Sequence, residues 1–199
     1  MFCYQCEQAA KGTGCTAMGV CGKDPRTAAL LDLLLYETMV LSDAALESGN
    51  CSDEVAKRVI ENLFTTVTNV NFDPEKLAEL VKETRKAAKE FEGGCSCCCG
   101  CGGSEDPTTE ELVEEGEEYS PQADIDKYGA DLGGLKWLAV YGLKGMAAYA
   151  DHAWILGQKD SEVNKFFLEA MSELLSEDIT IDSMLALNLK IGEVNLKVM

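Results

Sequence analysis

The sequence is poor in basic residues and contains a single histidine. Its 199 residues include 17 Lys and Arg against 35 Asp and Glu, which gives a formal net charge of −18. Nucleic acids and anionic membranes are themselves negatively charged, so an acidic protein of this kind is repelled by both. The charge balance therefore excludes nucleic acid and membrane surfaces as partners.

Long apolar runs are also missing. The longest, Ala28–Tyr36, is interrupted by Asp32 and is too short to span a bilayer. Nothing before the first cysteine has the features of a secretory signal. With 46% hydrophobic residues, the chain can bury one core or two small ones. We therefore expect a compact, water-soluble, cytoplasmic protein.

Cysteine, by contrast, is abundant near the N-terminus. Four cysteines lie within the first 21 residues, at Cys3, Cys6, Cys15 and Cys21. Thiolates at close, irregular spacing among glycines suit an iron–sulfur cluster, because glycine lets the backbone approach the sulfides. A disulfide knot fits a reducing compartment poorly, and zinc sites usually use two CxxC pairs where this stretch has one. The spacing favours a cluster and leaves both alternatives open.

Two segments resemble a known family. The first contains MFCYQCEQ, GTGC and GVCGK within residues 1–23, and the second is YGLKGMAAYADHA at 141–153. Both are similar to the hybrid cluster proteins, or hydroxylamine reductases, and more distantly to the nickel–iron carbon monoxide dehydrogenases. The resemblance implies that the four N-terminal cysteines bind a cubane [4Fe-4S] cluster. It also implies a first domain built from two helical bundles.

The resemblance does not extend to a catalytic site. Family members are more than twice as long, and His, Glu and Cys residues of two later domains hold their substrate-reducing hybrid cluster. In this sequence the only histidine is His152, and no cysteine follows Cys101. Catalytic residues therefore cannot be carried over, and we do not expect catalysis by the isolated chain.

The hydrophobic periodicity predicts an all-α fold made of two similar units. Helices are expected to begin at Asp24-Pro25, Ser52-Asp53 and Asp73-Pro74, and again near Asp131, Asp160 and Ile181. Similar residues recur about 108 positions apart, as in Leu35 and Leu143, Val55 and Val163, Glu61 and Glu169, Leu63 and Met171, and Leu77 and Leu185. We predict a cluster-binding loop at 1–24, a three-helix bundle at 25–92, a Cys-rich then acidic linker at 93–130, and a second three-helix bundle beside the first at 131–199.

Two parts of the linker have unusual composition. From Glu105 to Asp126 there are ten carboxylates and no Lys or Arg, which is typical of a solvated linker or a short exposed helix; docking of a basic partner is the alternative. Before it stands a run of five cysteines: Cys95, Cys97, Cys98, Cys99 and Cys101. Its C-x2-C-x2-C spacing is three quarters of a ferredoxin-type motif. A loop of reduced thiols, a second iron–sulfur cluster, and a zinc or other soft-metal site remain open.

Cys51 is a candidate further ligand for this second site. In an up-down-up bundle the first and third helices end at the same pole, which places Cys51 near the cysteine run. The N-terminal cysteines enter at the opposite pole, about 30 Å away for a helix of this length. That distance is too long for direct electron exchange between two centres.

His152 is expected to be a buried, hydrogen-bonded residue rather than a proton donor. Three functions remain for the chain as a whole. The first is a stand-alone iron–sulfur electron carrier. The second is the N-terminal part of a hydroxylamine or nitric oxide reductase whose catalytic domains are elsewhere. The third is a metal- or cluster-handling protein that acts through Cys95–Cys101. The expected partners are a redox protein or catalytic subunit, or a second copy of the chain.

Overall fold

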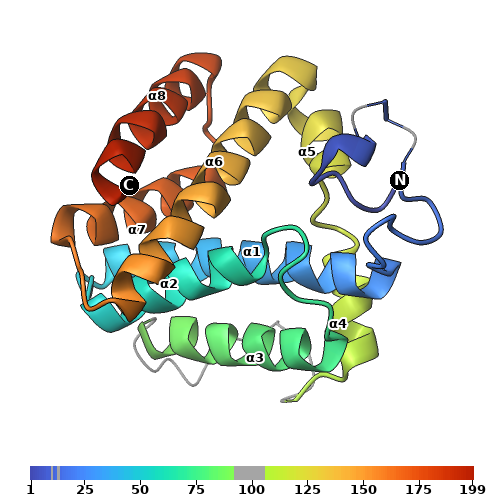
Figure 1. Cartoon of the computed structure of the whole chain (residues 1–199), viewed down its shortest axis with the longest axis horizontal. Helices are drawn as coiled ribbons and strands as arrows, with labels where there is room; N and C mark the ends of the chain where they lie inside the picture. Colours follow the sequence, from blue (N-terminus) through green and yellow to red (C-terminus); the bar gives the residue numbers. More distant parts are fainter. Residues whose placement is uncertain (10, 13, 92–105) are drawn as a thin grey trace.

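The computed structural model describes residues 1–9, 11–12, 14–91 and 106–199, and all regular structure in these ranges is helical (Figure 1). One 3-10 turn, η1 (Glu7–Ala9), precedes the helices α1 (Pro25–Glu47), α2 (Asp53–Thr65), α3 (Pro74–Phe91), α4 (Thr109–Gly116), α5 (Pro121–Tyr128), α6 (Ala130–Ile155), α7 (Ser161–Leu175) and α8 (Ile181–Val198). The all-α prediction is confirmed. Within the described ranges, no helix combines the length and apolarity needed to cross a membrane.

The helices begin where side chains cap them. The Asp24 carboxylate accepts a hydrogen bond from the Thr27 backbone N–H at 2.7 Å, and Pro25 occupies the first helical position of α1. At the other end of α1, Gly49 has a φ of +71°, a left-handed conformation that glycine adopts without strain. The helix starts expected from the sequence are therefore fixed by local chemistry.

The core is shared between the two halves of the chain. Helix α1 packs on α3 and α7, α2 packs on α6 and α7, and α6 packs on α8. One cluster of buried apolar residues draws on α1, α2, α6, α7 and α8, and a smaller one joins α1 to α3 and α4. Figure 1 shows α3 and α8 on the outer sides of the central helices. The two halves thus share one common core cluster, and α1, α3 and α4 enclose a smaller second one.

The helix order supports the interpretation of two similar units. Helices α2 and α7 begin at Asp53 and Ser161, and helices α3 and α8 begin at Pro74 and Ile181, close to the expected spacing. The contacts follow the same correspondence, because α1 packs on α7 while α2 packs on α6. If α1 corresponds to α6 and α2 to α7, the contact between α1 and α7 in one direction corresponds to the contact between α6 and α2 in the other.

The acidic segment forms two short helices that dock on the body. Leu112 of α4 is fully buried, and Gly116 lies so close to the Ala29 backbone that a Cβ there would sit 2.3 Å from the Ala29 carbonyl oxygen. Arg85 of α3 pairs with both Glu37 and Glu115, which ties α4 to α1 and α3. One face of the segment is therefore part of the fold, while carboxylates such as Glu110, Glu114, Glu117 and Glu118 are exposed.

Candidate metal centre

The N-terminal loop lies against the beginning of α1, at the right of Figure 1. Backbone hydrogen bonds fold it back on itself: the Phe2 N–H donates to the Cys15 carbonyl at 3.1 Å, and the Ala9 N–H donates to Cys6 at 2.9 Å. Gly14 permits this close folding, since a Cβ there would lie 2.1 Å from the Gln8 carbonyl oxygen. Gly14 therefore stands at a position where a side chain would clash with the loop backbone.

The four cysteines of the loop differ in exposure. Cys15 is buried, Cys3 is half-buried, and Cys6 and Cys21 are exposed; all four are free thiols. Cys15 has a φ of +49°, which is uncommon for a residue with a side chain. Among the residues that the structure describes, no three His, Cys, Asp or Glu side chains are gathered as a metal site. The assignment of these cysteines as ligands stays a prediction.

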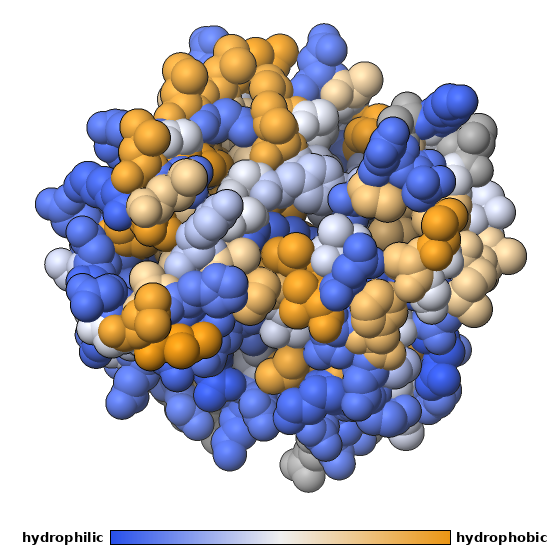
Figure 2. Space-filling view, viewed as in Figure 1, coloured by the Kyte–Doolittle hydropathy of each residue, from blue (hydrophilic) through white to orange (hydrophobic). Residues whose placement is uncertain are grey.

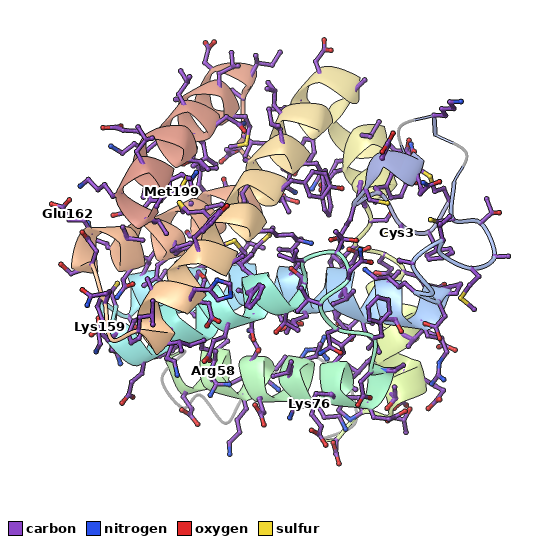
Figure 3. The ribbon with its side chains drawn as sticks, in the orientation of Figure 1. Cys3, Arg58, Lys76, Lys159, Glu162 and Met199 are labelled. Carbon is purple, nitrogen blue, oxygen red and sulfur yellow. The ribbon has the colours of Figure 1, made fainter. Side chains whose placement is uncertain are left out.

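Cys3 faces the helical body and a set of buried charges. Figure 3 labels Cys3 in the loop, on the side of the molecule where α1 begins. Burial raises the pKa of the Cys3 thiol, while a hydrogen bond from the Gln5 backbone N–H and the positive charge of Lys23 act in the opposite direction. Cys15 is close enough to disfavour ionisation of Cys3 as well. Cys3, Cys15 and Lys23 thus form the inner side of the loop.

Three charged side chains lie beneath this inner side. Lys23 is 1% exposed and Lys144 of α6 is 3% exposed. The Lys144 ammonium donates to the Thr66 carbonyl oxygen at 3.3 Å, at the end of α2. Burial raises the pKa of Asp32 on α1, whereas the positive charges of Lys144 and Lys23 act to lower it. Two buried ammonium groups therefore share one carboxylate in their vicinity.

Helix α6 holds the loop in place. Tyr141 donates a hydrogen bond from its hydroxyl to the Tyr4 carbonyl oxygen at 3.2 Å. Its ring lies 5.6 Å from that of Trp137, and both side chains line a narrow cleft together with Cys3 and Asp32. Contacts between the loop and α6 explain why the two family-like segments, far apart in the sequence, belong to one site.

A larger cavity adjoins the same region. It has a volume of about 500 Å³ and lies between α1, α5, α6 and α7. Asp32 and Trp137 line both this cavity and the cleft at Cys3. Asp124 at its wall is paired with Lys136 at 2.8 Å and accepts a hydrogen bond from the Trp137 indole at 2.8 Å.

Comparison with known proteins identifies the family. The profile of the Prismane/CO dehydrogenase family matches residues 1–199. The chain belongs to this family.

Relatives similar to the chain over its whole length include three hydroxylamine reductases. Identity is 38% to that of Methanocella arvoryzae over 210 residues, covering 100% of this chain and 39% of the relative. It is 42% to that of Maridesulfovibrio salexigens, of which 38% is covered, and 42% to that of Geobacter sulfurreducens, of which 39% is covered. The chain spans less than two fifths of the length of these relatives.

Membership in the Prismane/CO dehydrogenase family implies iron–sulfur chemistry, and the loop residues fit such a group. The loop offers four thiols, and Gly19 leaves room where a Cβ would lie 3.2 Å from the Cys21 sulfur. The Lys23 ammonium is buried and has no hydrogen-bond partner in the described part of the chain. A thiolate-ligated cluster is anionic and would supply the negative charge that this ammonium lacks.

The second cysteine group falls partly outside the described residues. Cys95, Cys97, Cys98, Cys99 and Cys101 all lie there, so the second centre stays a prediction. Cys51 is exposed and free, just after α1. Leu46 and Phe91, near the ends of α1 and α3, pack on the same core cluster. The two helices therefore end at the same pole, and the N-terminal loop lies at the other (Figure 1).

The prediction for His152 was wrong. The residue is exposed, and its ring makes an edge-to-face contact with Phe64 at 5.5 Å. Its neighbour Asp151 is buried instead. The small residues around His152 indicate close helix packing, but the rotation of α6 turns Asp151 and not His152 towards the body.

Sequence reasoning missed the charged part of the site. Asp32 was noted only as an interruption of an apolar run, and Lys144 only as part of a family-like segment. A charged residue inside an otherwise apolar helical face is itself a signal, because such residues are seldom buried without a partner. Lys23 carried no such signal, since it stands in a loop.

Proposed function

We propose that this chain is an iron–sulfur electron-transfer module. In this proposal Cys3, Cys6, Cys15 and Cys21 hold a cubane [4Fe-4S] cluster, which accepts and donates single electrons. The observation that carries the proposal is the four-thiol loop closed over a buried ammonium group without a partner. The Tyr141 hydrogen bond to the loop backbone supports the proposal, because it anchors the loop on α6.

Four cysteine ligands leave a cubane cluster no open coordination position for substrate. The proposed module therefore transfers electrons and does not itself reduce hydroxylamine. After anaerobic reconstitution, we expect one-electron reduction by reduced viologen and reoxidation in repeated cycles without loss of iron. Hydroxylamine turnover by homogeneous protein, above the rate of free iron–sulfide controls, would contradict the proposal that this chain transfers electrons without reducing hydroxylamine itself.

The partner in this proposal is polypeptide that corresponds to the remaining length of the hydroxylamine reductases. The share of those relatives that the chain covers favours it. An exposed apolar face on α6 and α8 favours it too, with hydrophobic side chains gathered over these helices at the top of Figure 2. The face is formed by Leu138, Tyr149, Ile181, Leu185, Leu189 and Leu196, which are 45–78% exposed.

The glycines on this face suit a protein partner. A Cβ at Gly134, Gly145 or Gly192 would meet no atom within 4 Å, so another helix can approach closely at these positions. We expect the separately produced remainder of the Geobacter sulfurreducens relative to bind the chain. Leu189→Glu should weaken binding at least tenfold, while Val20→Glu, at an equally exposed position of the loop, should not. Equal binding by both variants would remove this face from the proposal.

A further inference from the structure

We infer that the buried Lys23 ammonium lies against the iron–sulfur cluster and raises its reduction potential. The inference rests on the proposed function, because it requires a cluster in the N-terminal loop. It concerns a residue that is not a cluster ligand and that acts through its charge alone.

The first argument is the burial of an unpaired cation. Lys23 is 1% exposed, and its ammonium group is the single side-chain nitrogen or oxygen in the described residues that is both buried and without a hydrogen-bond partner. Burying an ammonium group without compensation costs several kcal/mol, on the order of the stability of a whole domain. An anion beside Lys23 removes that cost.

The second argument is the charge balance around Lys23. Lys144 is also buried, but its ammonium already donates to the Thr66 carbonyl oxygen. Among the residues that the structure describes, Asp32 is the one carboxylate whose charge acts on Lys144, and Lys23 opposes the ionisation of Lys144. The buried set therefore has an excess positive charge, which a cluster with four thiolate ligands would neutralise.

The third argument is position. The Lys23 carbonyl oxygen accepts a hydrogen bond from the Gly19 N–H at 2.7 Å, and the next residue, Asp24, caps α1. The backbone of Lys23 is thus fixed on both sides, two residues after Cys21. The positive charge of Lys23 also lies near enough to the Cys3 thiol to act on it.

A fixed positive charge at this position favours the reduced cluster. Reduction adds one negative charge, and the Coulomb attraction to a nearby ammonium grows in proportion. The low exposure of Lys23 limits screening by water and salt. Removing the charge should therefore make the cluster harder to reduce.

The test compares Lys23→Gln with Lys11→Gln in the reconstituted full chain. Lys11 is exposed in the same loop and serves as the matched control. Redox titration should show that Lys23→Gln lowers the equilibrium constant for reduction at least tenfold, a shift of 59 mV for a one-electron couple. The shift should persist at high salt, and Lys11→Gln should move the potential much less. Iron content is measured in parallel.

Lys23→Arg separates charge from packing. If Lys23→Gln binds no iron while Lys23→Arg binds it with a potential near that of the wild type, the cluster requires the charge. If both variants lose iron, Lys23 has a structural role and the inference is wrong. It is also wrong if Lys23→Gln keeps full iron and an unchanged potential. Failure of the wild-type chain to bind iron would instead remove the proposed function itself.

Discussion

The N-terminal loop and the helical body differ in what holds them in place. Among the described residues of the loop, only Cys15, Gly19 and Lys23 are buried, and Met18 and Val20 expose 57% and 76% of their surface. In the body, Leu30, Leu63 and many other side chains are fully buried in two clusters of apolar residues. The loop has no apolar core of its own.

The two regions therefore differ in the source of their folding free energy. Burial of apolar side chains stabilises the body without help from a ligand. The loop depends on a few backbone hydrogen bonds, the Tyr141 contact and, in our account, the binding energy of a cluster. A change in one region should therefore leave the other largely intact.

The largest expected effect is the loss of the cluster in Cys6→Ser. Without this thiolate the loop loses a ligand that nothing else in residues 1–24 replaces, so we expect the bound iron to fall from about four per chain to a small fraction. Far-UV circular dichroism should change little, because the body keeps its core. Cys51→Ser, at the opposite pole, should retain the N-terminal cluster signal. A full iron complement in Cys6→Ser would show that the ligand assignment is wrong.

Leu63→Ala should produce the reverse pattern. Leu63 is fully buried in the shared core, and its truncation should cost about 2–5 kcal/mol in the free energy of unfolding. Urea unfolding measures this loss, and iron binding should persist wherever the body stays folded. The control is Leu189→Ala on α8, where the side chain is 77% exposed and little should change. Similar losses in both variants would contradict the assigned core.

Tyr141→Phe tests the contact between the two regions. It removes one hydrogen bond to the Tyr4 carbonyl oxygen, a loss of about 0.5–1.5 kcal/mol. We expect a chelator to extract iron several-fold faster, with little change in the unfolding of the body. Tyr149→Phe, on the exposed side of the same helix, is the matched control. Equal extraction rates in both variants would argue against α6 as the support of the loop.

The smallest effect is expected for His152→Gln. His152 is exposed, so unfolding should shift by less than about 0.5 kcal/mol. The reduction potential of the variant, measured by redox titration at pH 6 and at pH 8, should equal that of the wild type at each pH. A different potential in the variant at either pH would restore a proton-transfer role for this histidine.

The sequence predicts the body far better than the site. Caps such as Asp24 and apolar periodicity are local features, so the helix starts and the all-α class follow from them. The packing of the two halves against each other does not follow from these local features. Periodicity indicates which face of a helix is buried, but not which other helix covers it. The burial of Lys23 and the exposure of His152 also depend on tertiary contacts.

The four N-terminal cysteines show the same limit within the site itself. Their spacing and the glycines between them favour an iron–sulfur cluster and leave a disulfide knot and a zinc site open. The spacing does not show that Cys3 and Cys15 turn inward while Cys6 and Cys21 remain exposed. That arrangement depends on a tight backbone turn at Gly14 and on the support of α6.

Whether the N-terminal loop binds a cubane cluster is tested by the iron and sulfide content of the anaerobically purified chain, combined with electron paramagnetic resonance of the reduced protein. If the N-terminal loop holds a cubane cluster, wild-type protein contains at least about four irons and four sulfides per chain. Its reduced form gives a cluster signal that disappears in Cys6→Ser. Fully reconstituted protein with fewer than two irons per chain, or with the same signal in both proteins, would contradict the account.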